Sequence, residues 1–365
     1  MFSKKIIIWS RKELRSSPKE NILKYVTVYV VGVAILFVGS ANADFAFGER
    51  VNLEWTIPVL DAANESIVCF SYDGLEMYIM SYRLGGWGNC DLWASRRGST
   101  GEDWGPPENL GFNVNSSFDD SFSSISNDGL TLYFHSNRSG GYGNYDIWVT
   151  TRTTKEAPWG PAVNVGPNIN SSVSDACPWV SPDGLELYFT SYRFGGYGDG
   201  DFYVARREAT NDPWGVAANL GPVVNSAYDE RGPSLSPDGL LLFFADISTT
   251  TQPRPGGYGN ADMWVTMRAT LSDPWQTPVN LGASVNGSAS DVMPRISPDG
   301  STLYYSEYSR DIGGIWENWQ ASLFYEPSCG DSAHPYPIGD LSRDCRADFF
   351  DLAILVAHWL EDNNP

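Results

Sequence analysis

The chain carries the stretch Ser181-Pro-Asp-Gly-Leu-Glu-Leu-Tyr-Phe-Thr-Ser-Tyr-Arg-Phe-Gly-Gly-Tyr-Gly198, which is one of five copies of the same pattern. The Asp-Gly pairs of the five repeats begin at Asp73, Asp128, Asp183, Asp238 and Asp299. Their spacing is 55 residues in the first three intervals and 61 in the last, and we place the extra residues in 248–255. A period of about 50 residues with several short strands is typical of a β-propeller.

Each repeat predicts four antiparallel strands, which is the content of one propeller blade. The first strand ends at Asp-Gly, the second alternates as Leu130–Phe134 does, the third begins at an Asp, and the fourth reads Asn-Leu-Gly. The fifth repeat lacks its fourth strand, and Val51–Leu53 precedes the first repeat with no strand of its own in front. We therefore predict an all-β, five-bladed propeller over residues 44–325, closed by an N-terminal strand that covers the open edge.

The charge of the chain excludes one class of partner. The net charge is −20, and residues 1–43 hold seven Lys or Arg against two Glu, so the rest carries −25. Such a surface repels phosphate groups, so we expect no nucleic-acid binding. It attracts divalent cations instead.

The N-terminus has the features of an export signal. Basic residues precede an apolar run at 26–38, and Ala41-Asn42-Ala43 follows as a small-x-small cleavage pattern. We predict a signal peptide over residues 1–43. The alternative is an uncleaved anchor that starts at Tyr25. Both place the remainder outside the cytoplasm, secreted or at the cell surface.

Export permits disulfide bonds, and five cysteines are present. Cys329 and Cys345 bracket part of the C-terminal region and form the favoured pair. Cys69 and Cys90 are a second candidate within the first repeat. The odd count leaves at least one thiol unpaired within the monomer, and the pairing of Cys177 is open.

Residues 50–325 resemble the WD40-like repeats of the PD40 type found in TolB. The resemblance rests on Ser-Pro-Asp-Gly, on Leu187-Tyr-Phe-x-Ser-x-Arg193 and on Asp146-Ile-Trp-Val149. It implies a propeller fold. Propellers of this kind serve as binding platforms, scaffolds and enzymes, so the function must come from the site.

An acid stands eight positions before every Asp-Gly pair. These residues are Glu65, Asp120, Asp175, Glu230 and Asp291. In a propeller the first strand of a blade is innermost, so the five carboxylates are expected to ring one mouth of the channel and to raise one another's pKa. One hypothesis is a polar mouth that binds a cation, Ca²⁺ above all, or a carbohydrate. The alternative is that each carboxylate accepts N–H groups of its own loop.

Other polar residues are interpreted from their place in the repeat. Arg83, Arg138, Arg193 and Arg254 each stand eight residues before an Asp of the third strand, and we expect each Arg and Asp to pair across the glycine-rich turn. His135 is expected to pack rather than to catalyse. Asp119, Arg231 and Arg295 depart from the repeat near the acidic ring, and no Ser/His/Asp signature accompanies them.

The C-terminal residues 326–365 have the oxygen spacing of an EF-hand calcium loop. The loop positions are Asp340, Ser342, Asp344, the Arg346 carbonyl, Asp348 and Asp351. With the apolar helix expected after them, they resemble one repeat of a type I dockerin, which implies Ca²⁺ and a cohesin-like or cell-surface partner. Cys345 stands where that family has Gly, and a Cys329–Cys345 bond would hold the turn. The alternative is an acidic linker before an amphipathic helix.

The sequence leaves two functional hypotheses open. The first is a non-catalytic binding or surface-assembly protein with a calcium-dependent tail, which the repetition of the polar residues favours. The second is a carbohydrate-active enzyme, a glycoside hydrolase or lyase, with its site at the acidic mouth. No catalytic residue is assigned.

Overall fold

The computed structural model describes residues 45–53, 57, 65–247, 254–309 and 315–325. Contacts divide the chain into two units, residues 47–324 and the two chain ends, of which only 45, 46 and 325 are described. The signal peptide, the tail with Cys329 and Cys345, and residues 248–253 of the insertion lie outside the described residues. Within the described ranges there is no α-helix, and hence none that could cross a membrane.

Three sheets contain four antiparallel strands each. The first consists of β3 (Glu65–Phe70), β4 (Glu76–Ser81), β5 (Asp91–Arg96) and β6 (Glu108–Asn109). The second consists of β7 (Asp120–Ile125), β8 (Thr131–Ser136), β9 (Asp146–Thr151) and β10 (Val163–Asn164). The third consists of β11 (Asp175–Val180), β12 (Glu186–Ser191), β13 (Asp201–Arg206) and β14 (Ala218–Asn219). These are the strands that the first three repeats predict.

The last two repeats share one larger sheet. Its nine strands are β15 (Asp229–Leu235), β16 (Leu241–Ile247), β17 (Ala261–Met267), β18 (Val279–Asn280), β19 (Ser290–Ile296), β20 (Thr302–Ser309), β21 (Ile315–Tyr325), β2 (Val51–Asn52) and β1 (Phe45–Phe47). The two antiparallel groups meet in parallel where Ala261 lies opposite Ser290. β2, which follows β1 (Phe45–Phe47), pairs with Trp319 and Gln320 of β21, so the predicted closure by the N-terminal strand is confirmed.

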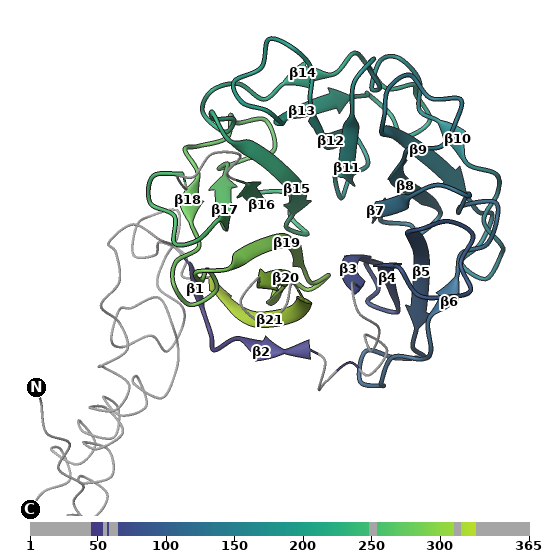
Figure 1. Ribbon diagram of the computed structural model, residues 1–365, viewed down its shortest axis with the longest axis horizontal. Coiled ribbons are helices and arrows are strands. Elements are labelled where there is room, and N and C mark those ends of the chain that lie inside the picture. Colours follow the sequence, from purple (N-terminus) through teal and green to yellow (C-terminus); the bar gives the residue numbers. More distant parts are fainter. Residues whose placement is uncertain (1–44, 54–56, 58–64, 248–253, 310–314, 326–365) are drawn as a thin grey trace, which may run out of the picture. The chain divides into compact units, whose positions relative to one another are not determined.

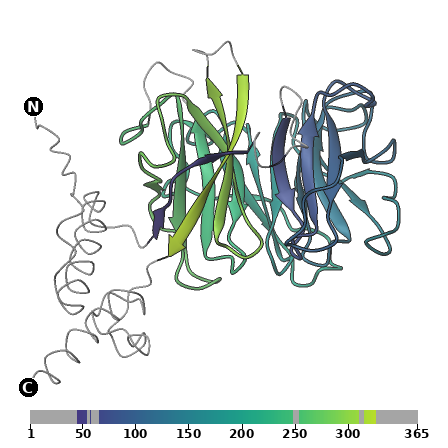
Figure 2. The same ribbon diagram turned by 90° about the horizontal axis from the view of Figure 1, so that it is seen from below.

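The sheets of residues 47–324 surround an axis, with β3, β7, β11, β15 and β19 innermost (Figure 1). Each of these strands contacts the next, and β19 contacts β3, which closes the ring. Seen from the side, the strands run between two faces (Figure 2). We call the face with the glycine-rich turns the turn face and the opposite one the Asp-Gly face. The β-propeller prediction is confirmed.

Side-chain hydrogen bonds build the Asp-Gly turns. Ser181 Oγ donates to Asp183 Oδ1 at 2.5 Å and accepts the Glu186 N–H at 2.8 Å. Asp183 also accepts the Leu185 N–H at 3.0 Å. Gly184 has φ +73°, a conformation that glycine adopts without a steric cost. The Ser-Pro-Asp-Gly motif therefore encodes one tight connection from the first strand to the second.

The glycine-rich turn is fixed by the Asp that follows it. Asp201 accepts the N–H groups of Tyr197 at 2.8 Å and Gly198 at 3.0 Å. A Cβ on Gly198 would lie 1.9 Å from the carbonyl oxygen of Tyr228, in the loop that leads to the next repeat. Only glycine allows this approach, so the turn is held against the neighbouring repeat on the turn face.

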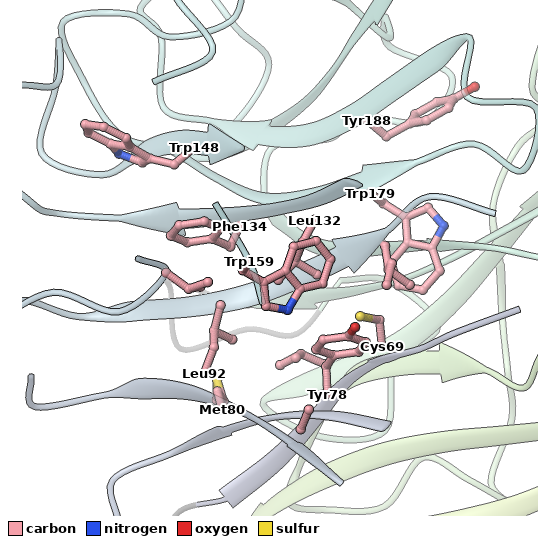
Figure 3. Packing of buried hydrophobic residues seen from close by; sticks show 14 of the residues in the cluster. Cys69, Tyr78, Met80, Leu92, Leu132, Phe134, Trp148, Trp159, Trp179 and Tyr188 are labelled. Atoms are coloured by element: carbon pink, nitrogen blue, oxygen red, sulfur yellow. The ribbon is translucent and has the colours of Figure 1, made fainter. Parts of the chain in front are cut away.

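The core lies between the sheets and is rich in aromatic side chains (Figure 3). Leu132, Phe134 and Tyr188 are fully buried within it. On the Asp-Gly side one Arg of each of the first four repeats stacks on a Trp of the same repeat at 4.1–4.5 Å, the pairs being Arg97–Trp104, Arg152–Trp159, Arg207–Trp214 and Arg268–Trp275. Such cation–π contacts favour burial of the guanidinium stems.

Candidate functional site

The five carboxylates of the predicted ring lie at the first or second residue of the innermost strands. All five are buried, with at most 2% of the residue exposed. Asp175 is representative, because it accepts the Ser171 N–H at 2.6 Å, the Ser171 hydroxyl at 2.7 Å and the Ser191 hydroxyl at 2.6 Å. These bonds stay within its own loop and hairpin, as the loop-maintenance alternative requires.

The arginines before the glycine-rich turns pair with the ring carboxylates, so the predicted partners were wrong. Arg83 contacts Glu65, Arg138 contacts Asp120, and Arg193 lies 3.1 Å from Asp175. Arg254 is 3.6 Å from Glu230. The third-strand Asp residues instead accept the turn N–H groups, because those donors lie closer in the hairpin than the guanidinium does.

Burial raises the pKa of three ring carboxyls, and two of them reach neutral values. The pKa of Glu230 and that of Asp291 rise to about 7, with burial the largest cause in both. Burial also raises the pKa of Asp175. The acids that add to these shifts are Asp201, Glu307 and Asp262, which lie outside the ring. The expected mutual repulsion of the ring is therefore not among the main causes.

The described residues contain no group of three or more His, Cys, Asp or Glu side chains placed to hold a metal ion. The proposed calcium ligands of residues 340–351 lie outside those residues. Cys69, Cys90 and Cys177 are buried free thiols, so the Cys69–Cys90 bond is not formed. Burial raises the pKa of Cys69 and of Cys90 to about 12, which keeps both thiols protonated and unreactive.

The axis of the ring is closed by side chains. Arg295 is 2% exposed and donates to the carbonyl oxygens of Val68 at 2.6 Å and Gly232 at 3.1 Å, so it ties three innermost strands together. Its guanidinium also lies 5.4 Å from the Trp179 ring. A cavity on the Asp-Gly side measures about 20 Å³, room for about one water molecule.

His135 is arranged for packing, not for activation of Ser121. Its Nδ1 accepts the Cys177 N–H at 3.0 Å, so Nε2 carries the proton and donates to Ser121 Oγ at 2.6 Å. A protonated Nε2 cannot take the proton of the serine, as a general base must. Burial, with Arg231 nearby, lowers the pKa of His135 to about 3, so the ring stays neutral.

An open pocket of about 490 Å³ lies on the turn face, between the glycine-rich turn of the third repeat and β15. Tyr192, Phe194, Asp229 and Arg231 line it. Arg231 Nε donates to Asp229 Oδ2 at 2.8 Å, and Tyr192 Oη donates to Asp229 Oδ1 at 3.1 Å. The Asp119 carboxylate, which also departs from the repeat, accepts the Tyr145 hydroxyl at 3.2 Å.

Exposed aromatic side chains gather on the turn face. Eight of the nine exposed Phe, Trp and Tyr residues in the described ranges lie there, and the ninth is Phe324. They are Tyr82, Trp87, Phe112, Phe118, Tyr142, Phe194, Tyr197 and Tyr258. Trp87, Tyr142, Tyr197 and Tyr258 occupy the same position of four successive repeats. The exposed aromatic rings of the described residues are thus concentrated on one face of the propeller.

The sequence identified Arg231 as a departure from the repeat but not the pocket around it. Tyr192 and Asp229 went unnoticed because each belongs to a different repeat and both resemble ordinary loop residues. A comparison of the residues that flank each ring acid would have found Asp229. The exposure of Phe194, at 97%, has no signal in the sequence.

No protein family model matches the chain, and no curated protein matches its sequence. Solved structures are similar to it. TolB from Acinetobacter baumannii is 16% identical over 76% of this chain and 63% of its own, with a TM-score of 0.44. This chain thus spans less than two thirds of that TolB.

Glycoside hydrolases are also among the similar structures. A thermostable family-43 glycoside hydrolase is 14% identical over 82% of this chain and 97% of its own, with a TM-score of 0.44. An arabinanase from Bacillus subtilis is 13% identical over 72% and 97%, with a TM-score of 0.43. These identities and TM-scores assign no function to this chain.

Proposed function

We propose that this chain is an exported binding protein whose turn face holds a neutral carbohydrate. The observation that carries the proposal is the set of eight exposed aromatic side chains on that face. Aromatic rings offer a flat apolar surface to the C–H face of a sugar, and polar groups beside them take its hydroxyls. The charge of −25 outside residues 1–43 disfavours acidic polysaccharides.

The architecture that we infer has five blades of the PD40 type. Three are the four-stranded sheets, and the larger sheet supplies β15–β18 as a fourth and β19–β21 with β2 as a fifth. The single parallel contact between Ala261 and Ser290 supports the division.

The chain ends complete the proposal. Residues 1–43 direct export, by a cleaved signal peptide or an uncleaved anchor. Residues 326–365 form a dockerin-like repeat that binds Ca²⁺ and attaches the propeller to a cohesin-like or cell-surface partner. Calorimetry of the full chain with Ca²⁺ tests this part, and binding heat that is lost in Asp344→Ala supports it. Equal heat in the variant, or none in either protein, contradicts it.

Affinity electrophoresis of the full chain through gels that contain neutral polysaccharides tests the binding function. Xylan, mannan and hydroxyethyl cellulose are suitable gels, with pectate as the acidic comparison. We expect retardation in at least one neutral gel and none in pectate. Unretarded migration in all the neutral gels contradicts the proposal.

A carbohydrate-active enzyme is the second candidate, because the carboxyls of Glu230 and Asp291 have pKa values of about 7, suited to proton transfer. Both carboxyls are fully buried and do not reach the turn-face surface, which favours binding over catalysis. A reducing-sugar assay on the same polysaccharides separates the two. If the wild type turns over a polysaccharide and Glu230→Gln does not, the chain is an enzyme and the binding proposal is wrong.

A further inference from the structure

We propose that the pocket between the third repeat and β15 is a subsite for one neutral sugar ring that carries adjacent hydroxyls. The inference rests on the proposed function and specifies where that function acts. The pocket, of about 490 Å³, has room for a sugar ring and opens on the face that carries the exposed aromatic side chains.

The combination of Asp229 with Arg231 in the pocket occurs in one repeat only. Arg231 follows the ring acid of the fourth repeat, where the other repeats have Ser66, Ser121, Ala176 and Val292. Asp229 precedes the same acid, at a position where the second repeat also has an acid, Asp119, and the third and fifth have Ser174 and Ser290. The blade does not need this pair, because the neighbouring repeats fold without it. A pair that blade architecture does not require, placed in an open pocket, points to a ligand.

The charges of the pocket exclude an anion as its ligand. Asp229 neutralises Arg231, and Asp175 neutralises Arg193, the other guanidinium that lines the pocket. Asp199 is exposed in the same lining and adds a negative charge. A carboxylate or phosphate ligand would have to displace Asp229, which the Tyr192 hydroxyl also holds. The pocket therefore suits a neutral, hydroxyl-rich molecule.

The pocket offers both hydrogen-bond donors and acceptors to a ligand. The Arg231 side chain is 43% exposed, and its guanidinium has five N–H donors, only some of which bind Asp229. The exposed Asp199 carboxylate supplies acceptors, whereas Asp229, at 1% exposed, holds Arg231 in place. Sugar hydroxyls need both kinds of group, and Arg231 is already fixed before the ligand arrives, which lowers the entropic cost of binding. Phe194, 97% exposed at the rim, can stack on the sugar face.

The test uses the double variant Asp229→Ser/Arg231→Ala of the full chain, which gives the fourth repeat the residues that Ser174 and Ala176 supply in the third. Asp119→Ser is the matched control, because it removes an acid at the position equivalent to Asp229 outside the pocket. Calorimetric titrations use cellohexaose, xylohexaose and mannohexaose, with a hexamer of galacturonate as the anionic probe. Thermal melts of the variants show that both remain folded.

We expect the wild type and Asp119→Ser to bind at least one neutral hexasaccharide with equal affinity, and the double variant to bind it at least tenfold more weakly. The galacturonate hexamer should bind at least tenfold more weakly than the neutral ligand. A folded double variant with wild-type affinity overturns the subsite and leaves the proposed function standing. Preference for galacturonate overturns the neutral class of ligand. A wild type that binds none of the four sugars overturns both the subsite and the function.

Discussion

The first three repeats and the last two hold the same ring carboxylate in different ways. In the first three, the second strand ends at Ser81, Ser136 or Ser191, and a close arginine pairs with the acid. In the last two, Asp246 and Glu307 stand opposite Glu230 and Asp291. Arg254 is 3.6 Å from Glu230, and Asp291 has the Gly287 N–H as a donor.

The difference shows that one position serves two electrostatic states. A serine and a close arginine favour the ionised form of a buried carboxyl, whereas a second acid beside it favours the neutral form. Burial is the largest cause of the pKa values of about 7 at Glu230 and Asp291, and for Asp291 the facing Glu307 adds to it. The repeat alone would have assigned all five the same role.

The largest expected effect on stability comes from breaking the ion pair between Arg138 and Asp120 in the second repeat. Arg138→Met leaves the fully buried Asp120 without its cation, so we expect the free energy of unfolding to fall by about 3–5 kcal/mol. Arg254→Met in the fourth repeat is the matched control, and its loss should be clearly smaller because its ion pair is longer. Urea denaturation measures both. Equal losses would contradict the distinction between the two groups.

The pH dependence of stability tests whether Asp291 is protonated in the folded protein. The folded protein holds the Asp291 proton more tightly than the unfolded chain, so the stability that Asp291 contributes is fully present below about pH 4 and is lost as the pH rises to about 7. The Asp291→Asn variant lacks this term, and its unfolding free energy should fall by about 1–3 kcal/mol less over that range. Urea denaturation at pH 4, 5.5 and 7 checks it. Parallel pH profiles for the two proteins would show that Asp291 does not hold the proton.

Asp246→Ser should convert the fourth repeat toward the first three. A serine there can donate to Glu230 as Ser191 donates to Asp175 at 2.6 Å, and it removes a buried second acid. We expect a gain of about 1 kcal/mol at pH 7, the usual net value of one hydrogen bond. The reverse change, Ser136→Asp in the second repeat, should destabilise the protein at pH 7. A loss of stability in Asp246→Ser would refute the account of the fourth repeat.

The smallest effect on stability is expected at the rim of the pocket. Phe194 is 97% exposed, so Phe194→Ala should change the unfolding free energy by less than about 0.5 kcal/mol. The same variant should weaken retardation in the neutral polysaccharide gels, because it removes a stacking surface. Phe324→Ala is the control, because Phe324 is the exposed aromatic residue of the described ranges that lies off the turn face. Unchanged retardation in Phe194→Ala would show that Phe194 does not contribute to polysaccharide binding.

Most of the fold followed from local chemistry that the sequence displays. Asp-Gly turns, alternating strands and the unpaired segment Val51–Leu53 each act through near neighbours, so the repeat order and the closure by β2 were predictable. The burial of the ring acids at the start of the innermost strands followed from the same period. The partner of Arg83 could not be predicted from the period. The hairpin register places the Arg83 side chain against Glu65, 18 residues away, rather than against Asp91.

The pocket could not be predicted from the sequence, because it forms only where two repeats of the closed ring meet. Tyr192 directly follows β12 and Arg231 belongs to β15, and the two meet because the third and fourth repeats pack side by side. The path of Arg295 into the axis likewise requires β3, β15 and β19 to converge. A periodic sequence does not predict such contacts between repeats, because the period shows only the features that all repeats share.

Hydrogen–deuterium exchange of the full chain with a mixture of cellohexaose, xylohexaose and mannohexaose tests the central claim most directly. We predict slower exchange in residues 192–200 and 229–231, at the pocket on the turn face, with the Asp-Gly turn at 181–186 unchanged. Protection confined to the Asp-Gly face, or none anywhere in residues 65–309, would contradict the account.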